Sequence, residues 1–177
     1  MNRKNVLFGL LAAGSLLATS LLAPSIGSAQ ADPRVQKAMA SLKDKAAKLG
    51  TPKLEGKEIV GSKDAPSLYF GSTKINNNFD IVDAVSKEDR QGMTATFFVK
   101  SADEFVRVST SVPKPDGSGR AIGTILDPQG KAIAEISQGK PFYGEVPILG
   151  TPYITGYEPM KDAAGNIIGI YYVGYKK

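Results

Sequence analysis

The chain contains no cysteine, no histidine and no tryptophan among its 177 residues. Without cysteine it can form neither a disulfide nor a thiolate nucleophile, and a zinc site built from Cys and His ligands is excluded. Without histidine there is no imidazole base, which excludes a Ser-His-Asp triad, a Cys-His dyad and an iron site with two histidines and a carboxylate. No pair of carboxylates is placed for acid–base work either. The sequence therefore predicts no enzyme and no cofactor.

The first 31 residues have the three parts of a secretory signal peptide. Basic Arg3 and Lys4 are followed by an apolar run over 6–23, and an Ala-x-Ala pattern closes the segment at 29–31. An uncleaved membrane anchor is the alternative, because the run approaches the ~20 apolar residues of a spanning helix. The small residues at its end favour cleavage after Ala31. We therefore expect a periplasmic or secreted protein with no later membrane span.

Charge gives no sign of a nucleic-acid partner. The formal net charge is +5, and it falls to +3 once Arg3 and Lys4 are removed with the leader. The remaining basic residues are dispersed, whereas nucleic-acid binding needs a clustered basic face. A chain of this length buries ~70% of its unfolded surface, so packing can stabilise it without disulfides.

The rest of the chain divides into an N-terminal helix at 32–50, a linker at 51–66 and a main domain at 67–177. Asp32 and Pro33 suit the N-cap and the first position of a helix. Apolar residues then recur at intervals of three and four, namely Val35, Met39, Leu42, Ala46 and Leu49. One interpretation is a homodimer formed through this helix; the other, favoured by its short length, is an amphipathic helix packed on its own domain. Gly, Pro, Lys and Glu dominate 51–66, which predicts the linker.

Alternating apolar residues in the main domain predict strands. We expect a short strand at 67–70 and five longer ones at 94–99, 104–110, 141–149, 152–160 and 166–175. Helical spacing predicts helices near 79–85 and 131–138. Tight turns between consecutive strands favour antiparallel pairing. The prediction is an α+β fold with a five-stranded antiparallel sheet, an N-terminal helix and covering helices.

Several blocks of this domain resemble single Cache domains, which are PAS-like extracytoplasmic sensor modules of chemotaxis receptors and sensor kinases. The most specific block is the closing hairpin at 153–175, from Tyr153-Ile-Thr-Gly-Tyr157 to Tyr171-Tyr-Val-Gly-Tyr175. The others follow in the same order at 70–79, 95–98, 106–110, 120–128 and 139–144. The resemblance implies a PAS-like fold that binds a small molecule, with small carboxylates as frequent ligands.

Receptors of this kind continue from the last strand into a transmembrane helix and an output domain. This sequence ends at Lys177, directly after its last predicted strand. We therefore expect a domain without transmembrane output, which senses a small organic acid and relays the signal to a separate membrane receptor or sensor kinase. The alternative is a ligand-free protein-interaction module of a signalling system.

The resemblance implies a ligand site between the sheet and the elements covering one face, and strand alternation nominates side chains for it. The candidates are Arg107, Ser109, Tyr143, Tyr153, Thr155 and Tyr157. Arg107 comes first, because a guanidinium can hold a carboxylate through two parallel hydrogen bonds. Alternatively, Arg107 lies on the solvent face beside Glu104 or Asp103, and the tyrosines are ordinary packing residues.

Other charged residues give weaker candidates. Arg120 and Lys100 are alternative partners for a carboxylate. Asp80 and Asp83 are three residues apart on one predicted helix, but no third ligand is near them in sequence. A calcium or magnesium site is therefore not expected.

Overall fold

The computed structural model describes residues 31–89 and 91–177, so the predicted leader lies outside the described residues except for Ala31. The elements are α1 (Pro33–Ala47), β1 (Pro52–Val60), β2 (Lys63–Phe70), β3 (Thr73–Lys74), α2 (Asp80–Lys87), β4 (Met93–Ser101), β5 (Glu104–Thr110), α3 (Lys131–Ile136), β6 (Phe142–Ile148), β7 (Thr151–Lys161) and β8 (Ile167–Lys176). No helix among these residues is long and apolar enough to cross a membrane.

A five-stranded antiparallel sheet in the order β5-β4-β8-β7-β6 forms the centre of the molecule. Its strands are the five that alternation predicts, and each bound differs from the prediction by one residue or two at most. The last strand, β8, lies between β4 and β7, so most of its residues are buried. The predicted α+β class with a five-stranded sheet is confirmed.

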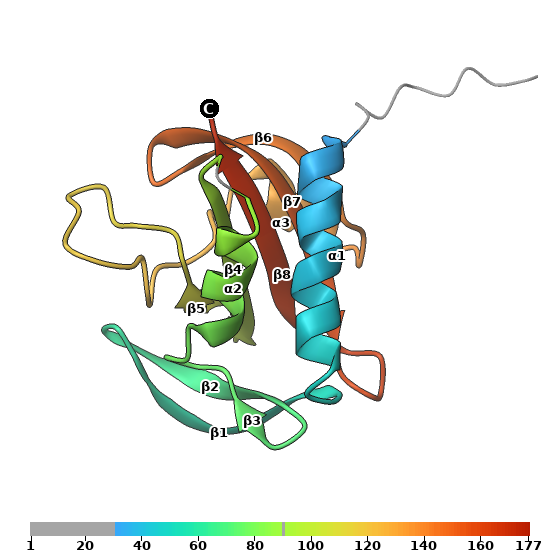
Figure 1. The fold of residues 1–177 in the computed structure, drawn as a ribbon. Helices are drawn as coiled ribbons and strands as arrows, with labels where there is room; N and C mark the ends of the chain where they lie inside the picture. Colours follow the sequence, from blue (N-terminus) through green and yellow to red (C-terminus); the bar gives the residue numbers. More distant parts are fainter. Residues whose placement is uncertain (1–30, 90) are drawn as a thin grey trace, which may run out of the picture.

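Helices α1 and α2 pack side by side on one face of this sheet (Figure 1). Asp32 caps α1 as expected, since its Oδ1 accepts a hydrogen bond from the Arg34 amide at 2.8 Å. The apolar side of α1, with Val35, Met39 and Leu42, is fully buried in the core on this face. A dimer formed through this helix would therefore have to use its exposed, basic side.

The segment 51–66 is not a linker, which corrects the prediction. It forms β1 and the start of β2, a hairpin that β3 extends into a second, three-stranded sheet (Figure 1). Gly56 lies at a break in the β1–β2 register, and most β1 side chains are exposed. The sequence of β1 therefore lacks the alternation of apolar and polar residues that marks a strand with one buried face. The hairpin is held instead by distant contacts, such as Phe70 on Phe97 and Tyr171.

The other face of the central sheet is covered by the segment between β5 and β6, which includes α3. A second core cluster lies there, with Phe98, Tyr157 and Tyr172 from the sheet and Leu126 and Ile136 from the covering segment. The segment adds no full strand, but it contacts the edge strand β5 through the bridge between Val106 and Ile125. This face carries the cavity that Arg107 lines.

Candidate functional site

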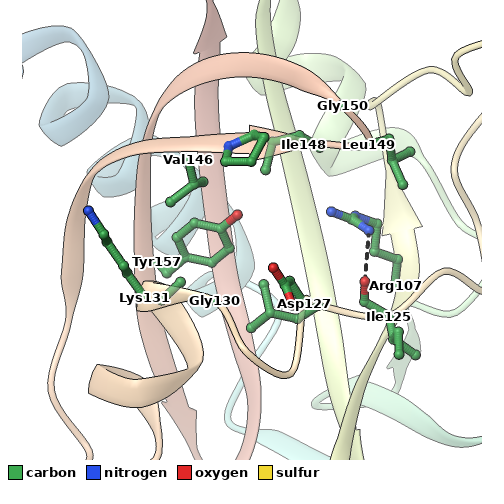
Figure 2. A pocket seen from close by; sticks show the side chains of 13 residues that line it. Arg107, Ile125, Asp127, Gly130, Lys131, Val146, Ile148, Leu149, Gly150 and Tyr157 are labelled. Atoms are coloured by element: carbon green, nitrogen blue, oxygen red, sulfur yellow. Dashed lines mark hydrogen bonds between the residues drawn. The ribbon is translucent and has the colours of Figure 1, made fainter.

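A cavity of about 380 Å³ lies between the five-stranded sheet and its covering segment (Figure 2). Arg107 reaches it from β5 and Tyr157 from β7. The remaining walls come from 125–132, which runs into α3, and from 146–150, the end of β6 and its turn. Most wall residues are apolar, including Ile125, Leu126, Val146, Pro147 and Ile148. Apolar walls with a few polar groups directed inward are typical of small-molecule sites.

Arg107 is the main polar group of the cavity, and it is only 3% exposed. Its Nη1 donates to Thr124 Oγ1 at 2.6 Å and to the Ile125 carbonyl at 3.4 Å. Its guanidinium lies 4.8 Å from the centre of the Phe98 ring. Within 31–89 and 91–177 no carboxylate forms an ion pair with Arg107, and its Nε has no hydrogen-bond partner. Burial accordingly lowers the pKa of Arg107.

The Tyr157 hydroxyl is the second unpaired polar atom in this cavity. The side chain is fully buried, with its ring centre 4.9 Å from that of Tyr172 and 6.2 Å from that of Phe142. Burial raises the pKa of the Tyr157 phenol well above its ordinary value, so the neutral hydroxyl, a donor, is the form present. Buried polar groups in proteins are nearly always hydrogen-bonded. Two unpaired donors in one cavity therefore indicate a place for an acceptor.

Tyr153 lies on the same face of β7 as Tyr157, four residues away, as alternation predicts. It lines a neighbouring cavity of about 290 Å³, which shares Ile148 and Leu149 with the first. Burial raises the pKa of Tyr153, and the charge of Arg107 acts on it in the opposite direction. Of the six predicted site residues, Arg107, Tyr153 and Tyr157 thus lie close together.

Ser109 lies on the opposite face of the sheet from Arg107. A β-bulge is the reason: Phe98 pairs with Arg107 but Phe97 pairs with Ser109, so Val108 is an extra residue. A bulge of this kind breaks the alternation of side chains along the strand. Ser109 Oγ donates to the Asn78 carbonyl at 2.6 Å, next to α2.

Tyr143 and Thr155 do not reach the cavity either. Tyr143 pairs with Gly156 in the sheet and packs on the α1 face, where its hydroxyl donates to Glu158 Oε1. Thr155 faces the cavity side of β7, but its Oγ1 donates to the Gly144 carbonyl at 2.7 Å. The hydroxyls of both side chains therefore form hydrogen bonds between β6 and β7 and do not face the cavity as free donors.

The alternative cations lie elsewhere. Arg120 forms a two-pronged ion pair with Asp83, with nitrogen–oxygen distances of 2.7 and 2.9 Å, and covers the Phe79 ring. Asp83 is thereby engaged by an arginine. Lys100 lines a separate cavity of about 160 Å³ with Phe105 and Ile133.

Sequence reasoning missed the residues that the covering segment brings to the cavity. Thr124 fixes the Arg107 guanidinium, and Asp127 and Lys131 stand in the cavity wall. The only sequence signal for Thr124 and Asp127 was the block 120–128 of the family resemblance, and Lys131 lies outside it. Their position depends on how the segment folds over β5, which local pattern does not specify.

Comparison with models of protein families finds a match to the Cache 3/Cache 2 fusion domain over residues 28–177. The match covers most of the chain and includes α1 and the β1–β2 hairpin as well as the central sheet. Comparison with curated proteins and with solved structures gives no significant match.

Proposed function

The chain belongs to the Cache 3/Cache 2 fusion domain family, and we propose that it binds a small organic acid through the acid's carboxylate. The family membership confirms the resemblance seen in the sequence. Cache domains are extracytoplasmic ligand-binding sensor domains and are typically not enzymes. The carboxylate class and the role of Arg107 go beyond what the family establishes, and they rest on the cavity.

The unpaired, buried guanidinium of Arg107 carries this proposal. A buried charge costs several kcal/mol unless it is paired. The hydrogen bonds of Arg107 to Thr124 and Ile125 use Nη1, while Nε remains without a partner. A carboxylate in the cavity would neutralise the charge and accept from the free guanidinium nitrogens. The Tyr157 hydroxyl, unpaired in the same cavity, would be a further donor to the ligand.

The cell context follows from the leader. We infer export guided by residues 1–31, cleavage after Ala31 and a location in the periplasm or outside the cell. Cleavage of the leader would release the domain from the membrane. We infer that the released domain relays ligand binding to a separate membrane receptor or sensor kinase. We infer sensing without catalysis, because the sequence provides no imidazole or thiol for the common enzyme mechanisms.

Thermal unfolding of the purified protein against a panel of carboxylates tests the proposal. A ligand at one hundred times its dissociation constant adds about 2.7 kcal/mol to the stability of the protein that binds it. For a domain of this size the unfolding temperature should rise by roughly 5–10 °C. We expect a shift for a subset of acids and none for the corresponding amides.

Two arginine variants separate the ligand role from a general effect of charge. Arg107→Lys keeps the charge but loses the two-pronged geometry, so the shift should be strongly reduced. Arg120→Lys makes the same change at an arginine paired with Asp83 outside the cavity, and the shift should persist. An equal shift in both variants would remove Arg107 from the site, and a panel without any shift would contradict the proposed function.

A further inference from the structure

The protein places a carboxylate of its own in the wall of the same cavity. Asp127 lies in the covering segment between β5 and α3. Its Oδ1 accepts from the Gln129 amide at 2.9 Å. No hydrogen bond to its Oδ2 is formed by the part of the chain that the structure describes. In Figure 2 the Asp127 carboxylate points into the cavity between Tyr157 and Arg107.

Asp127 and Arg107 do not neutralise each other. They line one cavity, yet no ion pair joins them among the residues that the structure describes. Both charges act on the Tyr157 hydroxyl, which lies on the far side of Asp127 from Arg107 in the view of Figure 2. Burial is the main cause of the raised pKa of this phenol; the charge of Arg107 lowers that pKa and the charge of Asp127 raises it. The cavity thus presents a cation and an anion to whatever occupies it.

Lys131 also belongs to the wall, but its position differs. In Figure 2 its side chain extends on the far side of Tyr157 from Arg107 and past Val146. Lys131 and Asp127 are both exposed, whereas Arg107 is buried, but of the two only Asp127 lies on the Arg107 side of Tyr157 in Figure 2. A ligand held by Arg107 and Tyr157 would therefore have Asp127 as the nearer charge.

We propose that Asp127 determines which acids the cavity accepts: those with one carboxylate and an amino or hydroxyl group beside it, and not di- or tricarboxylates. This inference rests on the proposed function, because Arg107 must first hold the carboxylate. A donor on the adjacent carbon would form a charge-assisted hydrogen bond with the free oxygen of Asp127. In a cavity of about 380 Å³ a second carboxylate would be brought close to Asp127 and repelled.

Three acids with the same carbon skeleton test this assignment. Propionate, lactate and alanine differ only in the group on the second carbon: none, a hydroxyl or an ammonium. Titration calorimetry with the purified protein should show lactate or alanine binding at least about fivefold more tightly than propionate, since hydrogen bonds to charged groups are among the stronger ones. Comparing lactate with alanine tells which donor is preferred. Succinate should bind more weakly than propionate.

The variant Asp127→Asn keeps the oxygen that accepts from the Gln129 amide but removes the charge. It should reduce the preference for lactate and alanine over propionate to about twofold or less, and it should improve the binding of succinate. Lys131→Gln is the matched control, because it removes a charge from the same wall. It should leave the preference for a donor unchanged.

The outcomes separate the two proposals. If the three-carbon acids bind equally to the wild-type protein, or if Asp127→Asn leaves their order unchanged, the role of Asp127 is overturned while binding through Arg107 stands. If none of the four acids binds, the proposed ligand class, acids with one carboxylate and a neighbouring amino or hydroxyl group, is overturned. If the wider panel of carboxylates gives no response either, the proposed function fails with it.

Discussion

Replacing Arg107 with methionine should make the unliganded protein more stable, although it removes the residue proposed to hold the ligand. Methionine fills a similar space with a flexible apolar chain. The replacement removes a guanidinium that is 3% exposed and has no carboxylate partner among the residues that the structure describes. Arg107→Met keeps about the same side-chain volume and removes the charge. The variant therefore tests whether the charge of Arg107 stabilises the fold or serves to bind the ligand.

The magnitude follows from opposing contributions. Burying an ion costs several kcal/mol even after relaxation. The hydrogen bond to Thr124 returns roughly 1.5–3 kcal/mol, and the contact with the Phe98 ring up to about 2 kcal/mol. Thr124 keeps its own hydrogen bond to the Ala121 carbonyl in the variant. We expect Arg107→Met to raise the free energy of unfolding by about 1–2 kcal/mol, which is roughly 2–8 °C in the unfolding temperature.

Urea unfolding without ligand measures this change, provided that the slope with denaturant stays the same. Arg120→Met is the control with the opposite sign. It strips the partner from half-buried Asp83, so it should lower stability by up to about 1 kcal/mol. A loss of more than about 1 kcal/mol in Arg107→Met would refute the reasoning, because Arg107 would then be a structural residue whose charge is satisfied by the fold.

Three further predictions follow from the same geometry. Tyr157→Phe should weaken carboxylate binding, measured by calorimetric titration, about tenfold. It should change stability little, since the Tyr157 hydroxyl is unpaired. Tyr143→Phe should leave binding unchanged in the same titration, and a loss of binding in this variant would place the ligand on the α1 face. Gly123→Ala should lower the free energy of unfolding, measured in urea, by more than about 2 kcal/mol, because the new Cβ would overlap the Val60 carbonyl and φ is positive at this position. Gly117→Ala is the control: φ is also positive there but the surrounding space is open, so it should cost about 1 kcal/mol. Alkali should also destabilise the protein. Burial raises the pKa of the Tyr157 phenol in the folded state above its value of about 10 in the unfolded chain. The stability that depends on the protonated phenol is therefore complete below about pH 10 and is lost as the pH rises above that value. Urea midpoints at about pH 8 and about pH 11 measure this loss, and equal midpoints would contradict it.

Much of the fold could be predicted from local pattern. The five central strands alternate with a period of two, and α1 repeats its apolar residues every three or four positions. Such periods arise from the geometry of each element, so the chain displays them without reference to its partners. Of the hairpin at 52–70 only the strand at 67–70 was predicted, because β1 is mostly exposed and interrupted at Gly56.

The candidate site was predicted only in part. From the sequence, Arg107 was the first candidate for holding a carboxylate, because no other residue type combines a permanent charge with a two-pronged donor. It also determined that Tyr153 and Tyr157 share a face of β7. Only the tertiary structure decided that Ser109 turns away at the bulge and that Tyr143 packs under α1. Strand register and the path of the covering segment depend on contacts between residues far apart in the chain, and these contacts bring Thr124 and Asp127 to the cavity.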